Sequence, residues 1–322
     1  MSEARTLMRV ENLSVAFAGS GPADGSERRF RAVDDVTLDI RAGEVLGLVG
    51  ESGSGKTTLA KALLRLYRPS AGRILFRDAD LAQLGERALR PYRRDLQMVF
   101  QDPLSSFNPR HTVAEALSVP LRLHAICPRA EIPAQIAATL TRVGLSPSFA
   151  ARFPHELSGG QLQRVAIGRA LTLSPGLLVA DEAVSKLDVS VRAQILNLLR
   201  DVQEASRLSI LFITHDLHVA RYLCHRIGVL YFGRLVELGP TEEIFTAPRH
   251  PYTKALLGTL DDDIASADER DPTAAPPSAT GCRYASRCPH AVSACGTAQP
   301  SLDDIGDGHV VACHRWRELA DA

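Results

Sequence analysis

One short glycine-rich pattern constrains the fold of this chain more than any other feature. Residues 50–57 match G-x4-G-K-S/T; an apolar run, residues 44–50, leads into the pattern and a helical pattern, residues 56–66, follows it. The glycines let successive backbone N–H groups turn toward phosphate oxygens at the start of a helix. Lys56 adds a positive charge for the β- and γ-phosphates, and the Thr57 hydroxyl is placed to ligate Mg²⁺. The residues predicted to bind nucleotide here are Gly50, Glu51, Ser52, Gly53, Ser54, Gly55, Lys56, Thr57 and Thr58.

Two acidic residues follow a second apolar run. Residues 177–180 (LLVA) lead directly into Asp181 and Glu182. A carboxylate fixed at the end of a strand can hold Mg²⁺ through its water shell, which is the role that we expect for Asp181. Glu182 lies one residue further and points to the other side, so it is suited to orienting and polarising an attacking water. Together with the phosphate loop, these acids predict a site that hydrolyses the bound nucleotide.

The arrangement of apolar runs predicts an α/β domain. Up to about residue 250, short β-branched runs alternate with amphipathic helical patterns, which favours a mostly parallel sheet. Residues 102–157 read as helical throughout, best at 112–124 and 131–143, and indicate a helical subdomain inserted into the core. The expected strands are residues 44–50, 96–101, 177–180 and 209–214, and the expected helices in the core are residues 56–66, 161–173 and 190–205.

The chain divides into three parts by composition. We expect a nucleotide-binding domain over residues 1–260 and a linker over residues 261–280, which is acidic and then rich in proline and alanine. A cysteine-rich segment, residues 281–322, follows the linker and is too small to fold well without a staple. Every motif for nucleotide chemistry lies before residue 216, so we expect nucleotide binding to be independent of this segment.

Charge and hydropathy exclude several classes of protein. Lysine plus arginine and aspartate plus glutamate each number 37, and no basic stripe supports nucleic-acid binding. The first 17 residues mix charges into every short apolar run, so no signal peptide is expected. No uncharged apolar stretch approaches the roughly 20 residues that span a bilayer. If the protein works at a membrane, it does so from outside the lipid.

A third motif narrows the class of phosphate-loop protein. Residues 157–161 read LSGGQ and continue as QLQRVA, and here the chain resembles the ATP-binding-cassette (ABC) ATPases. The resemblance implies a phosphate-loop fold with a mostly parallel core sheet, an antiparallel β subdomain and the inserted helical subdomain. It also implies that the signature binds the γ-phosphate of an ATP held by the opposite subunit, through Ser158, Gly159, Gly160 and Gln161.

The same resemblance assigns further site residues. Gln101 (FQDP) matches the loop residue that senses Mg²⁺ and the membrane partner, and His215 (ITHD) matches the switch histidine that contacts the γ-phosphate. Residues 185–188 match the loop that faces the other subunit. Phe17 lies where the family places an aromatic ring on adenine; Phe30 is a rival, and a core phenylalanine remains an alternative for both. The catalytic residues so predicted are Glu182, His215 and Gln101, with Thr57, Gln101 and Asp181 near Mg²⁺.

Two positions depart from the family pattern. The usual Asp-Glu-Pro appears as Asp-Glu-Ala, with Ala183 in place of proline, and this change is expected to loosen the turn after Glu182. The usual Ser-Ala-Leu-Asp carries Lys186 in its second position, which puts a long cation in a loop expected to face the other subunit. Because Glu182 and His215 are present, hydrolysis is still expected.

A narrower resemblance covers nearly the whole chain. The runs GESGSGKTTL, MVFQDPLSSFNPRHTVAEAL, FPHELSGGQLQRVAIGRAL, GRLVELGPTEEIF and HPYTKALL are similar to the ATPases of oligopeptide/dipeptide permeases, in particular their second ATPase type. The resemblance implies an importer motor at the cytoplasmic face of the membrane. Its partners would be a second ATPase subunit, most simply as a heterodimer, two permease subunits and, indirectly, an extracytoplasmic solute-binding protein. The transported solute cannot be read from a motor subunit.

Four cysteines crowd into the C-terminal segment. Cys282, Cys288, Cys295 and Cys313 follow the spacing C-x5-C-x6-C-x17-C, whereas Cys127 and Cys224 stand alone in apolar contexts and read as buried small side chains. Without a secretion signal, metal binding is favoured over disulfides. Four thiolates can enclose a [4Fe–4S] cluster or a Zn²⁺ ion, and the absence of a tight C-x2-C pair favours iron–sulfur. In relatives with this pattern the cysteines hold such a cluster.

Two other functions stay open at this point. A non-transport ABC ATPase of the DNA-maintenance type would split its halves with long coiled coils, and a translation-factor type would carry two cassettes. This chain has one cassette, and only about a hundred residues separate Lys56 from Ser158. An ATPase of a phosphonate-degrading complex is the third reading, which the four-cysteine tail disfavours.

Overall fold

The computed structural model describes residues 5–18, 29–258 and 280–319, which form two compact units. Within these ranges, the first unit comprises residues 5–8, 40–45 and 76–213. The second comprises residues 9–18, 29–39, 46–75, 214–258 and 280–319. Apart from Thr280, the predicted linker at 261–280 lies outside the described residues.

Three parallel strands form the centre of the first unit. β7 (Leu177–Asp181) lies between β6 (Leu96–Val99) and β8 (Ser209–Ile213), and its last residue, Asp181, pairs with Ile213. Every residue of β7 and β8 is buried, which explains why their sequences are continuous apolar runs rather than alternating ones. The strands predicted in these three places are confirmed.

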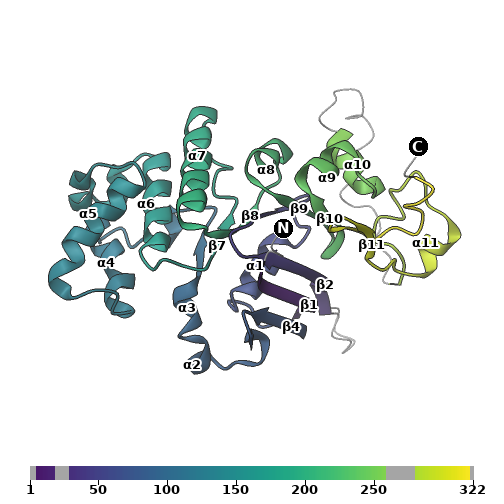
Figure 1. The fold of residues 1–322 in the computed structure, drawn as a ribbon, viewed down its shortest axis with the longest axis horizontal. Coiled ribbons are helices and arrows are strands. Elements are labelled where there is room, and N and C mark those ends of the chain that lie inside the picture. Colours follow the sequence, from purple (N-terminus) through teal and green to yellow (C-terminus); the bar gives the residue numbers. More distant parts are fainter. Residues whose placement is uncertain (1–4, 19–28, 259–279, 320–322) are drawn as a thin grey trace. The chain divides into compact units, whose positions relative to one another are not determined.

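Helices make up most of the rest of this unit. α4 (Val113–Leu123), α5 (Ile132–Arg142) and α6 (Gly159–Leu171) pack against one another (Figure 1). α4 starts at a capping box in which the Thr112 hydroxyl accepts from the Glu115 N–H and the Glu115 carboxylate accepts from the Thr112 N–H. The helices predicted at 112–124, 131–143 and 161–173 are confirmed to within two residues. The other elements are α7 (Val189–Ser206), α2 (Glu86–Leu89), α3 (Tyr92–Asp95) and the short strand β5 (Ala79–Asp80).

The second unit is built on strands from both halves of the sequence. β3 (Val45–Val49) runs parallel to β9 (Arg226–Tyr231), which pairs antiparallel with β10 (Arg234–Pro240). β2 (Arg29–Arg41), β1 (Thr6–Ala18) and β4 (Ala71–Phe76) are neighbours in a separate sheet. The helices are α1 (Lys56–Leu63), α8 (Leu217–Leu223), α9 (Thr241–Thr246), α10 (Pro251–Gly258) and α11 (Ser293–Thr297). In the described ranges, no helix is both long and apolar enough to span a bilayer.

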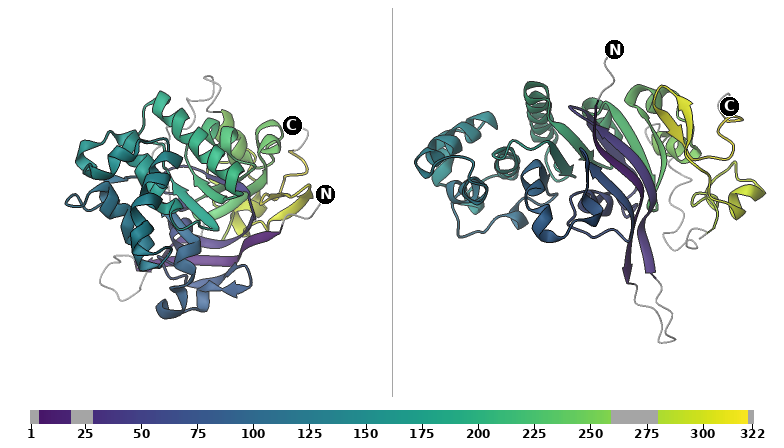
Figure 2. Two further views of the ribbon diagram at one scale, coloured as in Figure 1. Left: turned by 60° about the vertical axis from the view of Figure 1, so that its left-hand side comes forward. Right: turned by 60° about the horizontal axis from the view of Figure 1, so that its bottom comes forward.

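The C-terminal segment extends the sheet of this unit. β12 (His309–Val311) pairs antiparallel with β10, and β11 (Asp303–Gly306) pairs with β12. Both views of Figure 2 show this segment (yellow) beside β10 (green). Segment 281–322 was expected as a separate appendage after a linker. Its described part instead shares main-chain hydrogen bonds with β10, in the sheet that also contains β3.

A buried carboxylate fixes this attachment. Glu237 of β10 has no exposed surface, and its two oxygens accept the N–H groups of Arg249 at 2.7 Å and His250 at 3.0 Å. The ring Nε2 of His309, from β12, lies 2.8 Å from Glu237 Oε1. One side chain therefore holds the start of α10 and the C-terminal strand together.

We predict that Glu237→Gln lowers the free energy of unfolding by about 1–3 kcal/mol. Both carboxylate oxygens accept a backbone N–H, so an amide NH₂ placed on either side leaves one buried donor without an acceptor. Urea unfolding followed by circular dichroism measures the change. Glu242→Gln is the matched control because Glu242 is 69% exposed, and its effect should stay within about 0.5 kcal/mol. Equal stability of the two variants would contradict the prediction.

Candidate nucleotide-binding site

The phosphate loop joins β3 to α1, and its backbone requires glycine at two positions. Gly50 has φ 146° and Gly55 has φ 102°, in the region that other residues avoid. A Cβ atom on Gly50 would lie 2.1 Å from the carbonyl oxygen of Leu230, and one on Gly55 would lie 2.3 Å from that of Ala32. Neighbouring backbone therefore leaves no room for a side chain at either position. The glycines of the motif are set by packing as well as by backbone angle.

Lys56 lies inside this loop. It is 5% exposed, and its ammonium donates to the carbonyl oxygens of Gly50 and Glu51, each at 2.7 Å, and to the Ser54 hydroxyl at 3.3 Å. A buried ammonium surrounded by carbonyls is a fixed positive charge at the centre of the loop. Thr57, the next residue and the predicted Mg²⁺ ligand, is exposed. The arrangement suits the binding of an anionic group.

His215 is held in the same unit as the phosphate loop. The N–H of Thr214, which precedes it, donates to the carbonyl of Leu48 in β3 at 3.3 Å. Asp216, which follows it, accepts the N–H groups of His218 and Val219 and so caps α8. The backbone is therefore fixed on both sides of His215, whose side chain is exposed. Its contact with a γ-phosphate stays a prediction.

In the first unit, the structure brings together two of the predicted catalytic residues, Gln101 and Glu182. The Gln101 amide donates to the Glu182 carboxylate. Glu182 has φ 45°, and its N–H donates to the carbonyl of Ile213 in β8 at 3.0 Å. Asp181, the last residue of β7, is 5% exposed. The backbone thus bends at Glu182, directly after the buried Asp181. The separate metal and water roles of the two carboxylates stay predictions.

The LSGGQ residues form a capped helix start. Ser158 is the N-cap of α6; its hydroxyl accepts from the Gln161 N–H at 3.3 Å, and the Gln161 side chain accepts from the Ser158 N–H at 3.0 Å. Ser158 and Gly159 are exposed, whereas a Cβ on Gly160 would lie 2.3 Å from a methyl group of Val191. An exposed, glycine-lined helix N-terminus is suited to an anion, without a lysine.

Known proteins that are similar to this chain belong to the class that the phosphate loop and the LSGGQ motif indicate. Residues 33–185 match the model of the ABC transporter family, and residues 236–295 match that of the oligopeptide/dipeptide transporter C-terminal region. A putative peptide import ATP-binding protein of Brucella ovis is 47% identical over 89% of this chain and 92% of its own length. A putative oligopeptide transport ATP-binding protein of Bacillus subtilis is 42% identical over 97% of this chain and 96% of its own length. The chain belongs to the ATP-binding subunits of the oligopeptide/dipeptide family of ABC transporters.

Solved structures support the same fold. The ATP-binding cassette MJ0796, determined as a post-hydrolysis dimer with ADP and phosphate, has a TM-score of 0.65 and 30% identity over 73% of this chain and 98% of its own. The cassette cbiO1 of Clostridium perfringens has a TM-score of 0.64 and 26% identity over 80% of this chain and 96% of its own. The predicted ABC fold is confirmed, and the chain is an ABC ATPase, which hydrolyses ATP.

The turn after Glu182 is held without the proline that most ABC ATPases carry there. The Glu182 carbonyl accepts both the N–H of Ser185, at 3.1 Å, and its hydroxyl, at 3.0 Å. Ala183 is buried at 3% exposure. With alanine in place of proline, this turn keeps two hydrogen bonds from Ser185 to the Glu182 carbonyl. The expected loosening of the turn stays a prediction. Lys186 is exposed, as a residue of a subunit-facing loop should be.

Neither candidate for the adenine contact is a core residue. Phe17 is 38% exposed and Phe30 is 61% exposed, so the reading of either as a core phenylalanine is wrong. Phe17 is supported from one side, because its ring packs edge-on against Tyr67 with centroids 5.3 Å apart. A ring that is half exposed and held in place fits the stacking role better than a fully exposed one. The adenine contact of Phe17 stays a prediction.

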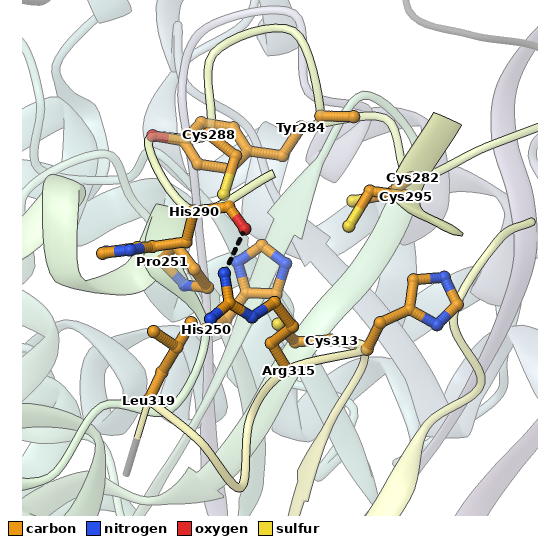
Figure 3. A pocket seen from close by; sticks show the side chains of 12 residues that line it. His250, Pro251, Cys282, Tyr284, Cys288, His290, Cys295, Cys313, Arg315 and Leu319 are labelled. Carbon is orange, nitrogen blue, oxygen red and sulfur yellow. Dashed lines mark hydrogen bonds between the residues drawn. The ribbon is translucent and has the colours of Figure 1, made fainter. Parts of the chain in front are cut away.

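The four clustered cysteines line one cavity that is partly open to solvent. Figure 3 shows the sulfur atoms of Cys282, Cys288, Cys295 and Cys313 directed into it. Arg315 spans one side of the cavity and donates to the carbonyl of His290 at 3.0 Å. Burial raises the pKa of Cys282, Cys288 and Cys313, that of Cys313 to about 11, and the neighbouring cysteines add to the rise.

The positions of the cysteines bear on the predictions of metal binding and of burial. Over the described ranges, no three His, Cys, Asp or Glu side chains are gathered closely enough to hold a single metal ion. Cys224 is 7% exposed, as predicted for a buried thiol. Cys127 is only half-buried, so the prediction of full burial was wrong for this residue. It follows the end of α4, where the chain turns at the surface.

Two residues that contact the phosphate loop, and a third in the C-terminal segment, were not predicted from the sequence. The Tyr252 hydroxyl accepts the N–H of Glu51 at 3.0 Å, and the Arg287 guanidinium lies 3.2 Å from both carboxylate oxygens of Glu51. Arg283 donates to the carbonyl of Phe232 and to Asp34. Tyr252 and Arg287 lie 201 and 236 residues from Glu51, and Arg283 lies 249 residues from Asp34 and 51 from Phe232. No local pattern marks such contacts. The cysteine segment is therefore not separate from the nucleotide motifs.

Proposed function

We propose that this chain is the ATP-hydrolysing subunit of an ABC importer for peptides. The observation that carries the proposal is a phosphate loop and a signature helix in a chain whose residues 236–295 match the C-terminal region of oligopeptide/dipeptide transporters. Relatives with 42–47% identity carry names that refer to peptide import or oligopeptide transport. Of the two ATPase types in these permeases, the chain resembles the second.

The residues have the following roles in this proposal. Lys56 and the loop amides bind the β- and γ-phosphates. Thr57, Gln101 and Asp181 are the residues predicted to hold Mg²⁺, which when bound would offset the charge of the phosphates. Glu182 accepts a proton from the attacking water, and its hydrogen bond with Gln101 sets its orientation. His215 contacts the γ-phosphate. Phe17 stacks on adenine.

Each chain supplies one phosphate loop and one signature, so a complete ATP site needs a second subunit. The exposed start of α6 is available for the γ-phosphate of an ATP bound to that subunit. We propose a heterodimer with a second ATPase subunit, docked on two permease subunits at the cytoplasmic face of the membrane, with a solute-binding protein acting on the other side. The cassette would occupy residues 1–260, including a helical subdomain at 102–157, and residues 281–322 would form the metal-binding segment.

The test is uptake of labelled di- and oligopeptides by a strain that lacks this gene. The wild-type chain should restore uptake, whereas Glu182→Gln should not, because removing the carboxylate lowers ATP hydrolysis by about 100-fold or more. The purified variant should still bind ATP and accumulate as an ATP-bound dimer. Glu242→Gln, which changes an exposed carboxylate on α9, should restore uptake fully. Unchanged peptide uptake in the deletion strain would contradict the peptide substrate, and hydrolysis by Glu182→Gln would contradict the role of Glu182.

We also propose that the cysteine cavity holds a [4Fe–4S] cluster. Support comes from four thiols that line one cavity. Their spacing, C-x5-C-x6-C-x17-C, lacks the tight C-x2-C pair that is usual for structural Zn²⁺. A cluster would bind the thiolates and so offset the cost of gathering four of them in one place. Its bonds would also staple a segment with few apolar contacts of its own.

Metal analysis of anaerobically purified protein tests this proposal. The protein should be brown and contain about four iron atoms per chain. Cys288→Ser should lose the colour and make residues 281–322 sensitive to protease, because one of the four bonds is gone. Cys127→Ser, which changes a half-buried cysteine outside the cavity, should keep both colour and iron. One zinc per chain without iron would overturn the cluster, and no metal would overturn metal binding altogether.

A further inference from the structure

The C-terminal segment reaches the nucleotide site through one residue, Glu51. Glu51 is the second residue of the phosphate loop, and its carboxylate forms an ion pair with Arg287 in which both oxygens lie 3.2 Å from Nη1. The two side chains are only 28% and 35% exposed, so water screens the pair less than at an open surface. The backbone N–H of Glu51 is also engaged, because it donates to the hydroxyl of Tyr252 at 3.0 Å.

Arg287 is carried by the turn that forms the cysteine cavity. It directly precedes Cys288, and its N–H donates to the carbonyl of Tyr284 at 3.0 Å. Ala285, in the same turn, donates its N–H to the carbonyl of Cys282 at 3.1 Å. The position of the guanidinium therefore depends on the backbone between Cys282 and Cys288, which lines the cavity seen in Figure 3.

Tyr252 links the same two places by packing. Its ring contacts that of Tyr284, with centroids 5.4 Å apart, and Tyr284 lines the cysteine cavity. Tyr252 is 2% exposed, and burial, with a smaller effect of the Glu51 charge, raises the pKa of its hydroxyl above the ordinary value. The hydroxyl therefore stays neutral and available as an acceptor for the Glu51 N–H.

The charge of Glu51 is unfavourable for the activity of this loop. A carboxylate next to a site for triphosphate repels the ligand, and the repulsion is strong where water is partly excluded. Arg287 pairs with that carboxylate and so reduces the repulsion that a phosphate meets near Lys56. The repulsion between Glu51 and a phosphate is thus reduced by an arginine that lies 236 residues further along the chain.

We propose that Arg287 and Tyr252 are positioning residues for ATP binding, and that they tie the phosphate loop to the cysteine cavity through Glu51. Full ATP affinity then requires a correctly folded C-terminal segment, contrary to the expectation that binding depends only on residues before 216. The inference rests on the ATP-binding role of the loop, and it holds whatever metal the cavity takes.

Equilibrium binding of ATP with Mg²⁺ to the full-length chain, by calorimetry, tests the proposal. Arg287→Gln should weaken binding by about three- to tenfold, because the Glu51 charge is left uncompensated. Arg287→Lys should retain most of the affinity. The decisive variant is Arg287→Gln combined with Glu51→Gln, which should recover affinity because the repelling charge is gone; damage to the fold alone would not be rescued in this way.

Two further variants separate positioning from general disturbance of the segment. Tyr252→Phe should speed amide hydrogen exchange at Glu51 in the nucleotide-free protein, because the N–H loses its acceptor. Arg315→Gln is the matched control, since Arg315 lines the cavity and bonds only to His290 and Glu318 among the described contacts. It should bind ATP as the wild type does.

Three outcomes would overturn the inference: wild-type affinity in Arg287→Gln, no recovery in the double variant, or an equal loss in Arg315→Gln. If the wild-type chain binds no ATP, the proposed function is overturned instead. The titration of the wild-type chain alone gives this result, so the two failures are distinguishable.

Discussion

The close approach of backbone to the phosphate loop is the constraint on which the other features depend. Gly50 and Gly55 lie against the carbonyl oxygens of Leu230 and Ala32, so the loop keeps its shape only while β9 and β2 keep theirs. That shape places the buried ammonium of Lys56 among loop carbonyls. The loop is therefore a product of tertiary packing around a local motif, and it acts as a preformed anion site.

The start of α6 is also a glycine-containing helix N-terminus that is suited to an anion, but it is shaped by a side-chain cap and by packing against Val191. α6 begins at Ser158 with a reciprocal cap to Gln161, and Gly160 is required because Val191 lies against it. Nothing in this second site supplies a lysine, so it suits a phosphate that is already bound elsewhere. The exposed start of α6 is therefore consistent with the proposal that a complete ATP site needs the motifs of two subunits.

Local features of the molecule were predictable from the sequence, and long-range ones were not. The phosphate loop, the Asp181–Glu182 pair and the capped start of α6 all follow from residues within a few positions of one another. The contacts of Glu237 with His309 and of Glu51 with Arg287 join segments that are 72 and 236 residues apart, and each partner is an ordinary charged residue in its own neighbourhood. The partial exposure of Cys127 likewise has no signal in its apolar sequence context.

The central claim is that the loop around Lys56 is the ATP site, and calorimetric titration of ATP with Mg²⁺ into wild-type and Lys56→Ala protein tests it most directly. The buried ammonium is the main counter-charge for the phosphates, so Lys56→Ala should bind ATP at least about 30-fold more weakly than the wild type. Arg142→Ala, which removes an exposed cation on α5, should bind as the wild type does. Undiminished ATP affinity in Lys56→Ala would contradict the account.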